Sequence, residues 1–164
     1  MHYNKKKTEN KFLSKKILKL ITLLGYSFPK SYIWCQGNNF KKQNVSFMIL
    51  IADIPFKLFN FRGLICILIV DDKEFKFTTY NNAKIIEYKV DDNVINIVLK
   101  KGHYYLYLNA KYNDGLTLYA PVSGKMKKDI LESISSSITV TLKNDKKVIF
   151  SSTSTNCGLE IVNE

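Results

Sequence analysis

The sequence predicts a mainly β protein, an antiparallel barrel or sandwich, and three observations support this. Apolar runs of strand length follow one another from about residue 27 to the end of the chain. Turn-forming residues separate these runs about every eight to twelve residues. The chain has 164 residues, which suits one domain and suffices to bury a sizeable core. We expect 25–164 to form the β domain and 1–24 to precede it as a basic tail and helix.

Residues 11–24 have the spacing of an amphipathic helix. Their apolar side chains recur at helical intervals between lysines: Phe12, Leu13, Ile17, Leu18, Leu20, Ile21 and Leu24. Three roles are open for this helix: peripheral contact with a membrane surface, a signal peptide, or docking on the β domain of the same chain. The apolar stretch is shorter than the roughly 20 residues that span a bilayer, and Lys19 interrupts it.

The strand predictions follow the chain in order. An extended segment lies within 27–40, and the near-continuous apolar runs 44–52 and 63–70 are typical of strands covered on both faces. Asp53-Ile54-Pro55 should end the first run, because proline cannot donate to a sheet ladder. Further strands are predicted at 75–80, 84–90, 94–100, 104–111, 116–120, 138–142, 148–152 and 157–162, with Pro121 ending the strand 116–120. Met126, Ile130, Leu131 and Ile134 share a helical register, which predicts a short helix at 125–137.

Composition narrows the classes of function. The formal net charge is +11, and much of it comes from lysines in the first thirty residues. A basic tail attracts phosphates and anionic membranes without specificity. Arginine is the usual bidentate reader of phosphate and guanine, and Arg62 is the only one, so we expect no nucleic-acid partner.

The number and spacing of the cysteines argue against a zinc-binding protein and against a disulfide-stabilised one. Cys35, Cys66 and Cys157 are odd in number and have no CxxC spacing, so neither a zinc site nor a disulfide framework follows. A reduced, cytoplasmic setting is the simplest interpretation, with membrane association through 11–24 as the open alternative. We expect no metal and no cofactor.

The segment from Trp34 to Asn39 joins the only tryptophan to several amide side chains. In an extended segment, alternation puts Trp34, Gln36 and Asn38 on one side. Buried amides need partners, so these either hold the backbone of a tight corner or line a pocket. Tyr105 and Tyr107 form a same-face pair that either lines the cavity or covers the exterior. The candidate ligand-binding residues are Trp34, Gln36, Asn38, Asn39, Tyr105 and Tyr107.

Several segments, taken in order and spacing, resemble the tocopherol cyclase-like family. They are SFPKSYIWCQGNNF at 27–40, SFM at 46–48 through ADIPF at 52–56, Gly63, FKFTTY at 75–80, LYAPVSGKM at 118–126 and GLE at 158–160. The resemblance covers roughly 27–164. It implies a lipocalin-like antiparallel β architecture of two related halves, of which this chain matches the C-terminal half only. Plant and cyanobacterial members close the chromanol ring of a prenylated quinol.

This chain departs from the family in two respects. It has about half the family's length, and residues 21–26 stand where the family commonly has an acidic-Lys-Asp-Trp-Gly element. We therefore expect a truncated or re-started gene product, completed by a second copy of itself or by the missing N-terminal half.

The resemblance implies a protein that binds an apolar prenyl-quinol or lipid-like ligand, with cyclase activity. The alternative is a truncated, non-catalytic lipocalin-like binding module or structural remnant. Ring closure needs a proton donor in an apolar cavity, and burial of a carboxylic acid serves this purpose by raising its pKa. The candidate acids are Asp53 and Glu160, whose structural interpretations are a turn cap and an outward strand residue or ion-pair partner.

Overall fold

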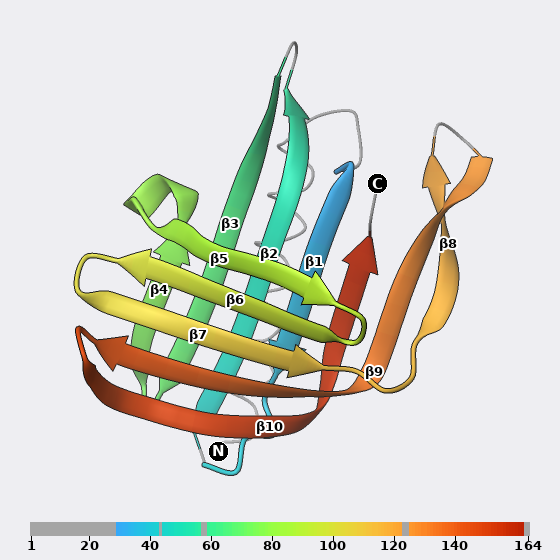
Figure 1. The fold of residues 1–164 in the computed structure, drawn as a ribbon. Coiled ribbons are helices and arrows are strands. Elements are labelled where there is room, and N and C mark those ends of the chain that lie inside the picture. Colours follow the sequence, from blue (N-terminus) through green and yellow to red (C-terminus); the bar gives the residue numbers. More distant parts are fainter. Residues whose placement is uncertain (1–28, 43, 57–58, 123–124, 163–164) are drawn as a thin grey trace, which may run out of the picture.

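The computed structural model describes residues 29–42, 44–56, 59–122 and 125–162. They form one ten-stranded antiparallel sheet, whose hydrogen-bonded order is β4-β3-β2-β1-β10-β9-β7-β6-β5, with β8 paired to β9 (Figure 1). The elements are β1 (Ser31–Gly37), β2 (Val45–Phe56), β3 (Phe59–Val70), β4 (Lys73–Thr78), the 3₁₀ helix η1 (Thr79–Asn81), β5 (Lys84–Asp91), β6 (Val94–Lys101), β7 (Tyr104–Lys111), β8 (Leu116–Val122), β9 (Lys125–Asn144) and β10 (Lys147–Val162). No helix among these residues is long and apolar enough to cross a membrane.

Two long strands bend the sheet into two layers. β9 pairs with β8 along its first half and with β7 along its second, while the end of β10 pairs with β1. Register shifts between β9 and β10 lie around Ser154 and Cys157, where a bulge lets a strand change direction. As a result β5–β7 cross in front of β1–β4 (Figure 1), and β4 and β5 end the path as separate edges.

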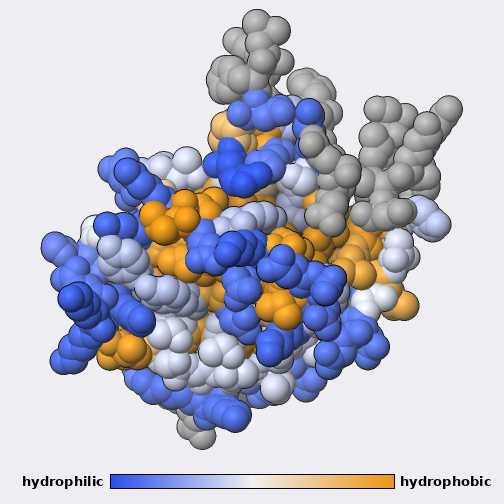
Figure 2. All heavy atoms as spheres, viewed as in Figure 1, coloured by the Kyte–Doolittle hydropathy of each residue, from blue (hydrophilic) through white to orange (hydrophobic). Residues whose placement is uncertain are grey.

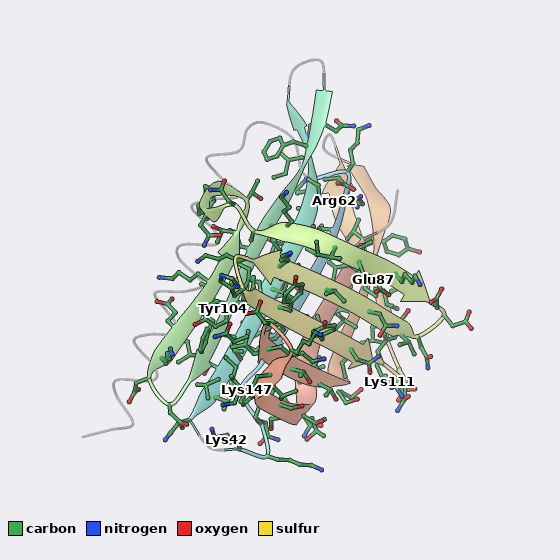
Figure 3. All side chains as sticks on the ribbon, turned by 60° about the vertical axis from the view of Figure 1, so that its left-hand side comes forward. Lys42, Arg62, Glu87, Tyr104, Lys111 and Lys147 are labelled. Carbon is green, nitrogen blue, oxygen red and sulfur yellow. The ribbon has the colours of Figure 1, made fainter. Side chains whose placement is uncertain are left out.

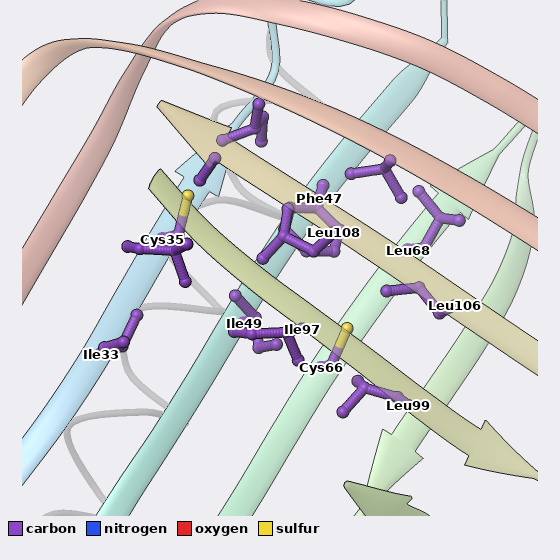
Figure 4. Packing of buried hydrophobic residues seen from close by; sticks show 14 of the residues in the cluster. Ile33, Cys35, Phe47, Ile49, Cys66, Leu68, Ile97, Leu99, Leu106 and Leu108 are labelled. Carbon is purple, nitrogen blue, oxygen red and sulfur yellow. The ribbon is translucent and has the colours of Figure 1, made fainter. Parts of the chain in front are cut away.

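The space between the layers is filled with apolar side chains (Figure 4). One residue in two along each strand points inward, as the pleat requires. From β1–β4 come Ile33, Cys35, Phe47, Ile49, Ile51, Leu64, Cys66, Leu68 and Phe77, and from β6, β7, β9 and β10 come Ile95, Ile97, Leu99, Leu106, Leu108, Ala110, Ile138, Val140, Leu142, Phe150, Cys157, Leu159 and Ile161. The main core of the domain therefore lies between the two layers.

The prediction of a mainly β, antiparallel fold is confirmed, but the strands predicted separately at 148–152 and 157–162 are one strand, β10. The strand ends predicted at Pro55 and Pro121 are also wrong. β2 continues through Pro55, which pairs with Asn60, and β8 continues through Pro121. Both prolines lie where the strand has a hydrogen-bonded neighbour on one side only. β1 begins at Ser31, opposite Asp53, and so does not extend to Pro55, and β8 pairs with β9 alone. A missing N–H is tolerated on such an edge.

The short helix predicted at 125–137 is also wrong, because that segment is the first part of β9. Its apolar residues have helical spacing, but the run from Ser135 to Thr141 consists of serine and β-branched residues, which are poor helix formers. Strands on both sides, β10 and either β8 or β7, supply the hydrogen bonds that a helix would have made internally. The N-terminal helix predicted at 11–24 lies outside the described residues.

Candidate functional site

A hollow of about 390 Å³ lies where the two layers separate, between β3, η1 and β5. Leu64, a core residue that is 3% exposed, forms part of its apolar lining, together with Ala83 and Ile85, which pack against the core. Its full lining is Arg62, Leu64, Thr79, Ala83, Ile85, Ile86, Glu87 and Tyr88. Four of these residues are apolar and four carry polar groups. A volume of this order lies within the range of small-molecule sites.

Arg62 is held at this hollow by Asp53 of β2, which in turn is bonded to Ser31 of β1. Its Nε donates to Asp53 Oδ1 and its Nη2 to Asp53 Oδ2, both at 2.7 Å. Ser31 Oγ donates to Asp53 Oδ2 at 2.8 Å. The register explains the cluster, because Ser31, Asp53 and Arg62 face one another across β1, β2 and β3. The hydrogen bonds from Arg62 keep the pKa of the Asp53 carboxyl below its ordinary value.

The same guanidinium also reaches the other layer. Arg62 Cζ lies 5.2 Å from the centre of the Tyr88 ring on β5, within cation–π range. Burial raises the pKa of the Tyr88 phenol, so Tyr88 stays a hydroxyl donor at neutral pH. Figure 3 shows Arg62 near the β2–β3 hairpin and Glu87 on β5. The hollow thus presents a fixed cation and a phenol beside an apolar wall.

Trp34 and Gln36 lie on the opposite face of β1, away from the core. Cys35, between them, points into the core, and Glu160 of β10 stands opposite Trp34. A β-carbon on Gly158 would lie 3.0 Å from Trp34 Cζ3, so the indole ring packs closely on β10 at this glycine. Trp34 borders a small second cluster formed by Tyr32, Ala52, Ile54 and Val162.

Glu160 belongs to this outer face as well. Tyr32 Oη donates to Glu160 Oε2 at 3.0 Å, and Glu132 stands opposite Glu160 on β9. Burial, followed by the nearby Glu160 carboxyl, raises the pKa of the Tyr32 phenol. The two candidate acids are therefore separated by the sheet: Asp53 lies on its inner face and Glu160 on its outer face.

The four candidates of the Trp34 segment lie away from the hollow at Arg62. Asn38 and Asn39 are exposed beyond the end of β1, and Asn39 Nδ2 approaches Thr155 Oγ1 at 3.5 Å. Neither this hollow nor the second one, described next, has Trp34, Gln36, Asn38 or Asn39 in its lining. Their role in binding a ligand stays a prediction.

Tyr105 and Tyr107 lie on the exterior of β7, the face turned to the viewer in Figure 2, where polar and apolar patches mix. Tyr107 is 36% exposed, and Lys143 Nζ lies 4.6 Å from its ring centre. Lys100 Nζ lies 5.0 Å from the ring centre of Tyr105. Tyr107 borders a hollow of about 240 Å³ lined by polar and apolar residues of β5, β6, β7 and β9.

Sequence reasoning missed Arg62 and Tyr88 as a pair. The available signal was that Arg62 is the only arginine, but nothing local connects it with Tyr88, 26 positions further on.

The part of the chain that the structure describes contains no group of three or more His, Cys, Asp or Glu side chains that could hold a metal ion. Cys35, Cys66 and Cys157 are buried and free.

Comparisons with protein-family models, curated proteins and solved structures found no match to this chain.

Proposed function

We propose that this chain is a tocopherol cyclase-like β domain that binds an apolar molecule with a hydroxylated ring, such as a prenyl-quinol or a lipid-like analogue. The observation behind this proposal is the hollow of about 390 Å³ with Arg62 and Tyr88 at its polar side. A ring oxygen would accept hydrogen bonds from Arg62 and Tyr88. The apolar part would lie against Leu64 and Ile85, where burial removes it from water.

Binding without turnover fits this hollow better than ring closure does. Closing a chromanol ring requires protonation of an alkene by a general acid. Of the two candidate acids, Asp53 is the one bonded to a residue that lines the hollow. Its hydrogen bonds with Arg62 lower its pKa, so it remains a carboxylate at neutral pH. The resemblance to the cyclase family supports the class of ligand, and the chemistry of Asp53 supports the non-catalytic form of the protein.

Cyclase activity is the second candidate, and Glu160 is the carboxyl that favours it. Tyr32 donates to Glu160 beside the indole of Trp34, so a polar pair stands in a largely apolar surface. A quinol ring placed against Trp34 would have its hydroxyl groups near this pair. If Glu160 is the acid of a cyclase, the reaction takes place on the outer face of the sheet, and the hollow at Arg62 is not its site.

The binding proposal is tested by calorimetric titration of the purified chain with a short-chain prenyl-quinol. Ile85→Trp fills the hollow, and Tyr88→Leu removes the phenol while keeping an apolar side chain. Each should weaken binding about tenfold or more, which corresponds to roughly 1.4 kcal/mol. Tyr105→Leu is the matched control, since Tyr105 is a tyrosine outside the hollow. Binding that Ile85→Trp leaves unchanged would exclude this site.

The same samples decide between binding and catalysis. After incubation with the prenyl-quinol, the products are separated by chromatography and examined for the chromanol. Ligand bound without chromanol supports the binding module. Chromanol that disappears in Glu160→Gln but persists in Asp53→Asn supports the cyclase with Glu160 as its acid.

A further inference from the structure

The hollow of about 240 Å³ beside Tyr107 lies on the outer face of the layer β5–β7 and extends to β9. Alternation turns one set of side chains from these strands into the core and the other set outward, to the face seen in Figure 2. The polar side chains that line the hollow belong to the outward set and are Glu87, Asn96, Tyr107, Asn109, Thr139 and Thr141. Of these, only Glu87 also lines the hollow at Arg62.

The register brings these side chains together from separate strands. Asn109 of β7 lies between Asn96 of β6 and Thr139 of β9. Tyr107, two positions before Asn109, lies opposite Thr141 of β9. Residues two positions apart on a strand share a face and lie about 7 Å from each other. The lining therefore consists of two adjacent rows of side chains that run across the sheet.

Hydrogen bonds hold the polar groups of the lining in place. Asn109 Nδ2 donates to Asn96 Oδ1 at 2.7 Å, which leaves Asn109 Oδ1 as an acceptor and Asn96 Nδ2 as a donor. Thr139 Oγ1 lies 2.9 Å from Thr153 Oγ1 on β10, and the hydroxyl of Thr141 is likewise bonded to β10. Groups that are already ordered lose little entropy when a ligand binds. Asparagine is depleted in strands, so a facing pair on two central strands favours a role in recognition.

The charge of the lining indicates a neutral ligand. Among the described residues, the lining contains one carboxylate, Glu87, and no basic side chain. Lys143, whose Nζ lies 4.6 Å from the Tyr107 ring centre, does not line the hollow. A carboxylate without a neighbouring cation repels an anion. Amides and hydroxyls that both donate and accept match a molecule with several hydroxyl groups, because each hydroxyl also does both.

Tyr107 supplies an apolar surface beside these polar groups. Its side chain is exposed and borders the hollow. An aromatic ring with a polar tip suits a ligand that is apolar on one side and polar on another. A sugar ring has this character, since C–H groups cover its faces and hydroxyl groups surround its edge. The volume of about 240 Å³ is smaller than the roughly 300–1,000 Å³ of sites for drug-sized molecules, so it suits a single ring.

We propose that this hollow binds one neutral sugar ring. The C–H face of the ring packs against Tyr107, and its hydroxyl groups bond to Asn96, Asn109 and the threonine hydroxyls of β9. This ligand is different from the one proposed for the hollow at Arg62, and neither proposal depends on the other.

Saturation-transfer NMR on the full chain tests the class of ligand. The probes are the methyl glycosides of glucose, galactose and mannose at millimolar concentration. At least one of them should bind, with a dissociation constant in the millimolar range. The uronate that corresponds to the tightest-binding sugar should bind more weakly, because it adds a negative charge near Glu87. Absence of binding by all three glycosides, or tighter binding by the uronate, would overturn the inference.

Variants locate the sugar on the sheet. Tyr107→Leu removes the aromatic ring and Asn109→Ala removes the central amide, and each should weaken binding at least tenfold. Tyr105→Leu is the matched control, since Tyr105 is a tyrosine of the same strand and face that does not line the hollow, and it should leave binding unchanged. The circular dichroism of the sheet confirms that each variant is folded. Equal binding by Tyr107→Leu and the unaltered chain would contradict the proposal.

Two further variants complete the test. Val98→Trp places a large side chain in the hollow from β6 and should also weaken sugar binding at least tenfold, which gives a result even if Tyr107→Leu does not fold. Ile85→Trp fills the hollow at Arg62 and should leave sugar binding unchanged. Loss of sugar binding in Ile85→Trp, with Val98→Trp unaffected, would place the sugar in the hollow at Arg62 and overturn the inference. Failure of prenyl-quinol binding in the same samples would bear only on that other hollow.

Discussion

Arg62 and Asp53 stand opposite each other on β3 and β2 and share two hydrogen bonds of 2.7 Å. The pair lies at the rim of the hollow, and the Arg62 guanidinium also contacts the Tyr88 ring across the gap between the layers. One ionic contact thus orders the polar side of the proposed ligand site. It also determines how Asp53 responds to acid.

Asp53→Asn should destabilise the protein at pH 7 by less than about 1 kcal/mol, since the pair is partly exposed. The pKa of Asp53 is lowered in the folded state, so its contribution is complete above the unfolded value of about 4. The contribution is lost as the pH falls through the folded pKa, because the unfolded chain binds this proton more tightly. Urea unfolding at a series of pH values should show the difference between the two proteins shrinking below about pH 4. A difference that stays constant down to pH 2 would contradict this account.

Gly158→Ala should lower the free energy of unfolding by about 1 kcal/mol, because the new methyl group would lie 3.0 Å from the Trp34 ring. Trp34 emission should change with it. Gly102→Ala is the control: Gly102 has a φ of 56° and no atom within 4 Å of an added β-carbon. Its cost is backbone strain of about 1–2 kcal/mol, so stability should fall while Trp34 emission stays the same.

All three thiols should be unreactive toward a thiol reagent at pH 8 in the native protein. Cys35, Cys66 and Cys157 are each 0% exposed, and burial raises the pKa of every one of them, which suppresses the reactive thiolate. In denaturant all three should react. The rate in buffer should follow unfolding, so it should rise with urea. A thiol that reacts rapidly without urea would show that its part of the core opens locally.

Ser135→Val should be more stable than Ser135→Ala by a few tenths of a kcal/mol. Ser135 is exposed within β9, where a β-branched residue fits the pleated surface better than alanine. In a helix the order would be reversed, because alanine has the highest helix propensity. Thermal unfolding of the two variants measures the difference, and alanine as the more stable variant would argue for the helix instead of the strand.

Most strands could be predicted because their signals are local. The turn at Asp91, Asp92 and Asn93 separates two alternating runs, and β5 and β6 meet there as expected. The prediction for 125–137 was wrong because the local spacing of its apolar residues favours a helix, whereas most of its strand partners are distant in the sequence. The site was harder still: Trp34 was recognised as unusual, but Arg62 and Tyr88 come from strands that no local pattern brings together.

The sequence by itself determined which residues share a face of each strand, because side chains alternate with a period of two. It separated Trp34 and Gln36 from Cys35, and it marked β2 and β3 as apolar on both faces. Only the tertiary structure decided which of those faces became the interior. That choice depends on β9 and β10, whose bend lays β5–β7 over one side of β1–β4 and leaves Trp34 on the other. The physical reason is that alternation is a local property of the backbone, whereas burial depends on which distant strands pack against it.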